Sequence, residues 1–97
     1  MHTFIALLNF TDQGIQHLKD SPHRADMFLE VAEKAGAHVK DVYWTLGHHD
    51  GVLIIEAPDD ETAAAVLLSL GSNGNVRIET LRAFDWAEFQ TVLDHIS

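Results

Sequence analysis

The segment Tyr43–Asp60, YWTLGHHDGVLIIEAPDD, indicates the order of strands and helices most clearly when it is read together with Val76–Phe84, VRIETLRAF. An apolar strand leads into a polar turn with glycine, and a second apolar strand then ends at a proline followed by acids that can cap a helix. After that helix, the second quoted segment has the β-branched and apolar residues of another strand. The order predicts a hairpin and then a crossover back into the same sheet.

Apolar patterning outside these segments completes the list of expected elements. His2–Phe10 is apolar almost throughout, which is typical of a strand in the middle of a sheet. Ser21 and Pro22 predict a helix start, because a hydroxyl can cap the first turn and proline has its φ preset. That helix ends at Gly36. The other expected elements are a helical turn capped by Thr11, strands at His38–Leu46, Val52–Ala57 and Val76–Ala83, a helix capped by Asp59 or Asp60 that stops at Gly71, and a last helix under a capping box of Asp85 and Glu88.

Residues 1–97 therefore read as one domain with the order β-α-β-β-α-β and a C-terminal helix. Right-handed crossovers make this a ferredoxin-like α+β fold, an antiparallel sheet with helices on one face. The strands are apolar toward both faces, and a large uncovered apolar face marks an interface. The simplest cover is a second copy, so we expect a homodimer or an assembly of dimers of the α+β barrel type, with Phe4 or Trp44 at the seam.

Composition argues against several classes of protein. Six Lys and Arg stand against fifteen Asp and Glu, a formal charge of −9, so we expect no nucleic acid partner. The absence of cysteine removes disulfides, thiolate zinc sites and a cysteine nucleophile. No apolar run approaches the roughly 20 residues of a membrane span, and the N-terminus has no basic segment or cleavage site of an export signal. We expect a cytoplasmic protein without a membrane partner.

Several segments resemble the GYD-domain family of small bacterial proteins. They are LLNFTDQGI (7–15), SPHRAD (21–26), DVYWTLG (41–47), APDDE (57–61) and VRIETLRAF (76–84). The resemblance implies a dimeric α+β barrel and no established activity. The turn that names the family is Gly-Tyr-Asp, whereas this chain reads Gly47, His48, His49 and Asp50, so His49 stands where tyrosine is usual. An imidazole can also donate a hydrogen bond, as a phenol does.

The turn and the histidines give the first candidate residues. Gly47 is expected at positive φ, and the Asp50 carboxylate is expected to accept hydrogen bonds from turn amides. Seven histidines raise the question of a metal, but a helical site needs histidines at i and i+4 and a strand site at i and i+2. Neither spacing occurs, although Asp50 could join His48 or His49 as a ligand. We predict no metal site and no cofactor.

Aromatic and cationic strand residues give the remaining candidates. Tyr43 and Trp44 are adjacent, so one faces the helices and the other faces the seam. Arg82 lies on the opposite face of its strand from Arg77 and Glu79, and a guanidinium suits bidentate capture of a carboxylate or phosphate. The ligand-binding candidates are Trp44, His49 and Arg82.

Three functions remain open from the sequence. The preferred one is a small-molecule-binding or assembly module, homo-oligomeric, with a mainly apolar pocket between sheet and helices. The alternative is a cofactor-independent enzyme of the monooxygenase or isomerase type, with His49 as general base and Asp50 and Arg82 as further catalytic candidates. The second alternative is a histidine metal-binding protein.

Overall fold

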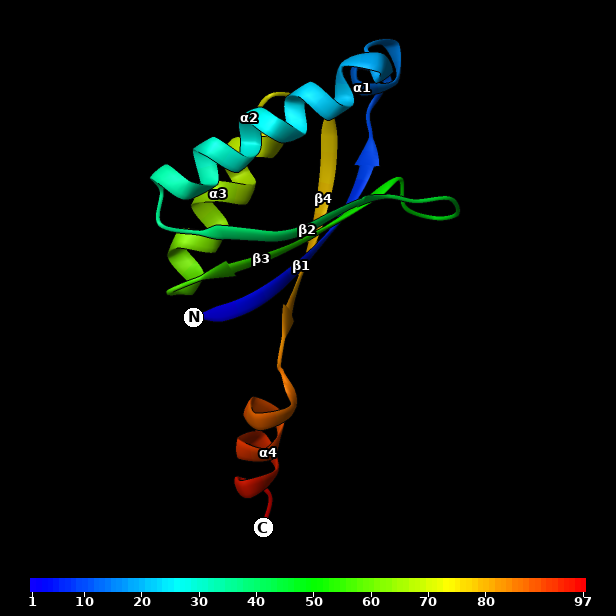
Figure 1. Cartoon of the computed structure of the whole chain (residues 1–97). Helices are drawn as coiled ribbons and strands as arrows, with labels where there is room; N and C mark the ends of the chain where they lie inside the picture. The colour runs from blue at the N-terminus through cyan, green and yellow to red at the C-terminus, as the bar shows by residue number, and fades with distance from the viewer.

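The predicted hairpin and crossover form in the computed structural model, which describes all of residues 1–97. The elements along the chain are β1 (His2–Phe10), α1 (Asp12–Gln16), a 3-10 turn (Leu18–Asp20), α2 (Ser21–Lys34), β2 (His38–Trp44), β3 (Gly51–Ala57), α3 (Asp60–Ser72), β4 (Val76–Ala83) and α4 (Trp86–Asp94). The strands lie in the order β2-β3-β1-β4, and every neighbouring pair is antiparallel. Helices α2 and α3 lie on one side of this sheet (Figure 1). The expected ferredoxin-like α+β fold is confirmed.

The strand register assigns every side chain to one of two faces. Phe4 lies opposite Ile55 on β3 and Arg82 on β4, and partners in a register point to the same side of a sheet. This side faces α2 and α3 and carries the core. The buried core residues are Phe4, Ala6, Phe28, Ala32, Ala37, Val39, Leu53, Ile55, Ala57, Ala63, Val66 and Leu67.

The same register corrects the expected seam. Phe4 is buried in the core, and Trp44 lies opposite Gly51, which lies opposite Leu8 on the helix side. Neither side chain points toward the open face, so the placement of Phe4 or Trp44 at the seam is wrong. Because β1 is apolar at consecutive positions, its sequence does not show which set of alternate residues faces the helices.

The open face of the sheet is nonetheless apolar. It carries Ile5, Leu7, Tyr43, Val52, Ile54 and Leu81. Tyr43 is 56% exposed, and no helix of the chain packs over this side, which is opposite to α2 and α3 in Figure 1. The expectation that the strands are apolar on both faces while helices cover only one is confirmed.

Local capping explains where most helices begin. The Thr11 hydroxyl accepts from the Gly14 N–H at 3.1 Å, and Asp59 Oδ1 accepts from the Thr62 N–H at 2.7 Å. Hydrogen bonds from Thr62 hold the pKa of Asp59 below its ordinary value. Asp85 and Glu88 form the expected capping box at the start of α4, with bonds of 2.7 and 3.0 Å. These caps need only residues close in sequence, so sequence alone predicts them.

Several boundaries differ from expectation. Ser21 is the first residue of α2 rather than its cap, and its hydroxyl accepts from Arg24 Nη2 instead of from a backbone amide. Helix α3 passes through Gly71 to Ser72, and the left-handed residue that follows is Gly74 at φ 83°. Strand β2 ends at Trp44, before Leu46.

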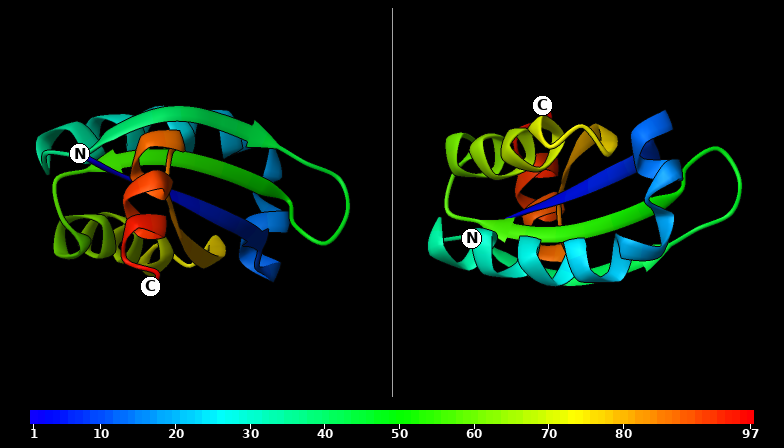
Figure 2. Two further views of the ribbon diagram at one scale, coloured as in Figure 1. Left: turned by 90° about the horizontal axis from the view of Figure 1, so that it is seen from below. Right: turned by 90° about the horizontal axis from the view of Figure 1, so that it is seen from above.

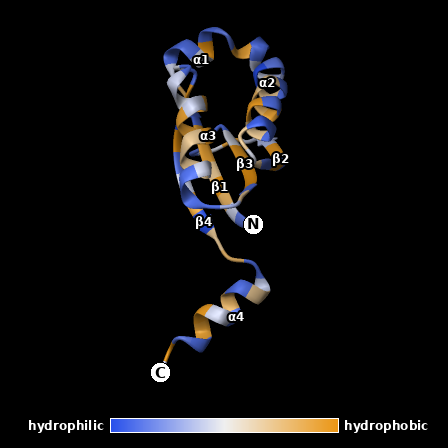
Figure 3. Cartoon of the chain, turned by 90° about the vertical axis from the view of Figure 1, so that its left-hand side faces the viewer, coloured by the Kyte–Doolittle hydropathy of each residue, from blue (hydrophilic) through white to orange (hydrophobic).

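Helix α4 extends away from the rest of the domain, beyond the end of β4 (Figure 1), and it lies in front of the sheet when the molecule is seen from below (Figure 2, left). None of its residues is buried, and Trp86 is 91% exposed. Apolar residues nevertheless run along the helix in Figure 3. The exposed ones, counted one turn past its end, are Trp86, Phe89, Val92, Leu93 and Ile96. None of the helices combines the length and the apolar character of a membrane-spanning segment.

Candidate functional site

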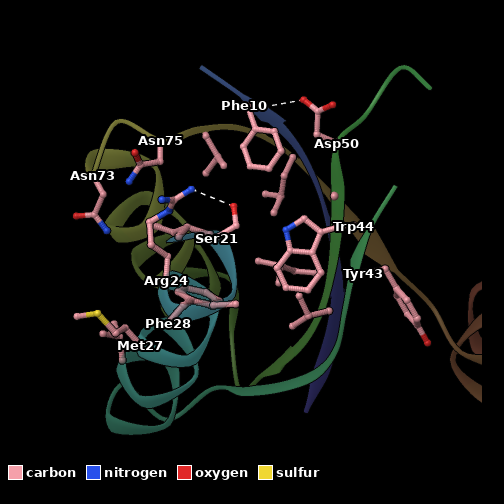
Figure 4. A pocket seen from close by; sticks show the side chains of 18 of the residues that line it. Phe10, Ser21, Arg24, Met27, Phe28, Tyr43, Trp44, Asp50, Asn73 and Asn75 are labelled. Carbon is pink, nitrogen blue, oxygen red and sulfur yellow. Dashed lines mark hydrogen bonds between the residues drawn. The ribbon is translucent and has the colours of Figure 1, made fainter. Parts of the chain in front are cut away.

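A cavity of about 170 Å³ lies between the sheet and helices α2 and α3. Its walls are mainly apolar and come from both layers (Figure 4). The principal wall residues are Leu8, Phe10, Phe28, Trp44, Leu53 and Leu70. The cavity forms where two small residues, Ala25 on α2 and Gly51 on β3, also line it. Because Gly51 lies opposite both Leu8 and Trp44, no side chain from β3 fills the space between them.

Polar side chains stand around this apolar space. They are Ser21, Arg24, Asp50, Ser69, Asn73 and Asn75. Arg24 Nη1 donates to the His17 carbonyl at 2.8 Å, and Arg24 Nη2 donates to the Ser21 hydroxyl at 3.0 Å. In Figure 4, Arg24 and the two asparagines lie on one side of the cavity, and Trp44 and Asp50 lie on the other. The composition, apolar walls with a few placed polar groups, is the usual one for a ligand pocket.

Asp50 holds the end of the β2–β3 hairpin against β1. Its Oδ2 atom accepts from the Phe10 N–H at 2.9 Å, and its own N–H donates to the Leu8 carbonyl at 2.7 Å. The expectation that Asp50 accepts from turn amides is therefore wrong, because the neighbouring strand supplies the donor. Gly47 has φ 111°, as expected for this turn.

His49 lies on the hairpin turn beside Asn9 and outside the cavity. Its Nδ1 atom is 2.9 Å from Asn9 Oδ1, and its carbonyl accepts from the Thr45 hydroxyl at 2.6 Å. Asn9 also donates to the His48 carbonyl at 2.7 Å, so one side chain fastens both histidines to the end of β1. The structure thus brings Trp44 and Asp50 together at the cavity, whereas His49 does not line it. A role for His49 as general base stays a prediction.

Arg82 lies at the opposite end of β1 from the cavity. Its guanidinium is 5.6 Å from the centre of the Phe4 ring and 4.6 Å from that of Phe84. Its Nη2 atom is 2.7 Å from His2 Nδ1 and 3.3 Å from Glu88 Oε2. The Asp85 N–H, and then Arg82, hold the pKa of Glu88 below its ordinary value. Arg82 therefore joins α4 to the sheet through an ion pair, and its role as an anion-binding residue stays a prediction.

Metal-binding geometry is not assembled by the fold. No group of three or more histidine and carboxylate side chains lies close enough together to hold a metal ion. The nearest approaches are pairs, such as His38 with Glu33 at 3.1 Å and His2 with Glu88 at 3.8 Å. Nothing in this arrangement favours the histidine metal-binding hypothesis.

Sequence reasoning did not single out Arg24 as a site residue. A usable signal exists, because Ser21, Arg24 and Phe28 recur at the i, i+3, i+7 spacing of one helix face. A cation on a helix face that also carries a buried phenylalanine lies near the boundary of the core. Asn73 and Asn75 gave no such signal, because only the tertiary fold brings their loop to the cavity.

Comparisons with known proteins agree with this architecture. The profile of the GYD domain matches residues 4–93. A Thermus thermophilus protein named "Glutamine synthetase and cystathionine beta-lyase binding protein" is 37% identical over 89 residues, which is 91% of this chain and 94% of that protein. The crystal structure of a protein from the same organism superposes with a TM-score of 0.57 at 25% identity, over 88% of this chain and 95% of that one. The resemblance found in the sequence is confirmed.

The Asp50 contact gives a direct prediction for the stability of the cavity wall. Asp50→Ala leaves the Phe10 N–H without its acceptor and should lower the free energy of unfolding by about 1–3 kcal/mol. Asp50→Asn keeps an acceptor oxygen and should lose less than half of that amount. His49→Ala removes only the part-buried contact with Asn9 and should change little. Urea unfolding of the three variants measures these differences, and an Asp50→Ala variant as stable as the parent would contradict the assignment.

Proposed function

We propose that this chain, which belongs to the GYD-domain family, is a non-catalytic module that binds a small, mainly apolar molecule in the cavity beneath α2 and α3. The observation that carries the proposal is the cavity itself, about 170 Å³ with apolar walls. An apolar space of about 150 Å³ in a protein interior is enough to accept one aromatic ring. The expected ligand is thus of the size of a single ring or a short branched chain.

Trp44 is the proposed ligand contact. Its indole lines the cavity and is still 51% exposed, so a ligand against it would remove apolar surface from water. Asp50 is the only carboxylate that lines the cavity, and no histidine lines the cavity. The Asp50 carboxylate already accepts a hydrogen bond from the Phe10 N–H. The cavity therefore has no pair of side chains that could act as general acid and general base. For this reason we prefer a binding function over cofactor-independent catalysis.

A neutral aromatic probe tests the cavity. Trp86→Phe leaves Trp44 as the only tryptophan, and benzyl alcohol should then shift its fluorescence saturably. Ala25→Leu adds bulk inside the cavity and should abolish the shift. Ala64→Leu adds the same bulk on an exposed site of α3 and should not. A saturable shift that survives Ala25→Leu would place the probe elsewhere and contradict the proposal.

Self-association is the second part of the proposed function. The open face of the sheet carries the six apolar side chains named above, and the cavity opens on the other side of the sheet. We infer that a second copy covers this face, because two identical apolar sheet faces can pack together as in a sandwich. Such a homodimer would leave both cavities accessible to ligand.

A charge placed in the open face tests the dimer. The parent should scatter light with about twice the monomer mass of 10.8 kDa. Ile54→Lys should bring the mass down to that of a monomer, because an unpaired charge buried at a seam costs several kcal/mol. Leu68→Lys changes a residue of α3 that is 73% exposed and should remain dimeric. A parent that is monomeric at micromolar concentration would refute self-association.

Binding to other proteins is a second candidate function. The Thermus thermophilus relative is named as a binding protein of two enzymes, and α4 of this chain presents apolar residues with no cover. We propose that α4 contacts a partner protein, with Trp86 as its central side chain, since tryptophan is enriched at energetically dominant interface positions.

Purified glutamine synthetase and cystathionine beta-lyase from the same organism as this chain are the probes for this candidate. Trp86→Ser should weaken binding to at least one of them by about tenfold or more, and Leu68→Ser on α3 should not. The proposed protein-binding role of α4 is wrong if neither enzyme binds the parent protein, or if the Trp86→Ser variant binds the enzymes as tightly as the parent does.

A further inference from the structure

We propose that the cavity selects a carboxylate, an aromatic or branched aliphatic acid whose anionic head is bound by Arg24 while its apolar body lies against Trp44 and Phe28. This inference rests on the proposed binding function and adds the chemical class of the ligand. The evidence for this ligand class is the position of Arg24 at the cavity and the hydrogen bonds that its guanidinium makes.

Arg24 is a cation at the cavity that has no carboxylate partner. Ion pairs within 4.0 Å in this chain involve only His2, His38 and Arg82 among the basic groups, although fifteen acids are available to six Lys and Arg. The two hydrogen bonds of the guanidinium go to neutral oxygens, the His17 carbonyl and the Ser21 hydroxyl. The positive charge of Arg24 is therefore held in place by hydrogen bonds, and no carboxylate of the protein neutralises it.

The guanidinium still has donors to offer. It carries five N–H groups in a fixed fork, and two bonds leave part of that fork free for a carboxylate. Because the bonds to His17 and Ser21 restrain the side chain, less entropy is lost when it binds a ligand. Arg24 is also the fourth residue of α2, close to the helix N-terminus, where the peptide dipoles favour an anion.

The apolar walls define the other end of the ligand. Phe28 lies one turn after Arg24 on α2, and Trp44 faces the helix from β2 (Figure 4). An acid with its head at Arg24 would therefore place its body between these two rings. The size of the cavity limits that body to about one aromatic ring.

Asp50 is the charged group that opposes this assignment. It lines the cavity on the side of Trp44, but no oxygen of it lies within 4.0 Å of the Arg24 guanidinium, and its Oδ2 atom is taken by the Phe10 amide. If Asp50 rather than Arg24 selected the ligand, an amine would bind better than an acid. The comparison of an acid with an amine of the same shape therefore decides between the two residues.

The experiment compares three ligands of one shape on the Trp86→Phe protein at neutral pH, with Trp44 fluorescence as the readout. Phenylacetate should bind about tenfold or more tightly than phenylacetamide, and phenethylamine should bind most weakly. The preference for phenylacetate should shrink as salt is added, because its source is a charge near the surface.

Two variants locate the charge. Arg24→Gln should remove the preference for phenylacetate and keep the binding of phenylacetamide, while Arg24→Lys should keep part of the preference. Arg77→Gln removes an arginine from the open face of β4 and should leave the preference intact. Since the three-ligand comparison is made on a protein with Arg24 present, it stays decisive even if an Arg24 variant folds poorly.

The outcomes separate this inference from the proposed function. Equal binding of phenylacetate and phenylacetamide, or tighter binding of phenethylamine, overturns the role of Arg24 and leaves the cavity as a binding site. If none of the three ligands, nor benzyl alcohol, binds at the cavity, then both the inference and the proposed function are wrong.

Discussion

The antiparallel pairing of β1 with both β3 and β4 determines which side chains form the core and which form the open face. Through one register, Phe4, Ala6 and Leu8 point toward the helices, while Ile5 and Leu7 point to the open face. A shift by one residue would exchange the two sets, placing Ile5 and Leu7 under the helices. The core, the cavity and the proposed seam thus all follow from the same strand.

The two ends of β1 have different roles. At its end near Phe10, Asp50 and Asn9 tie the hairpin to the strand, and this contact closes one wall of the cavity. At its beginning, His2 and Phe4 contact Arg82, whose ion pair with Glu88 connects the sheet to α4. The candidate binding site and the candidate protein-binding helix are therefore at opposite ends of one central strand.

Sequence reasoning predicted the features that local chemistry controls. The caps at Thr11, Asp59 and Asp85 and the positive φ of Gly47 need only neighbouring residues, and all are present. The order of elements followed from apolar patterning, and with it the fold class. The candidate Trp44 was found because an aromatic on a strand must face one layer or the other.

What sequence reasoning could not supply depends on contacts between distant segments. Because both faces of β1 are apolar, its sequence did not show which face meets the helices. The seam was expected at Phe4 or Trp44, and both of these side chains face the helices. Arg24 was missed because it becomes a candidate ligand contact only beside the cavity, and the opposite wall of that cavity is formed by β2 and β3. Ser21 was expected to cap α2, but the Arg24 guanidinium takes its hydroxyl instead.

The proposed binding function requires that the ligand lie on the helix side of the sheet and not on its open face. Isotope-filtered nuclear Overhauser spectra of the labelled protein with phenylacetate distinguish the two faces. Contacts are expected from the ring protons of the ligand to Trp44, Phe28 and Leu8, and none to Ile5 or Leu7. Contacts to Ile5 and Leu7 without any to Trp44 would contradict it.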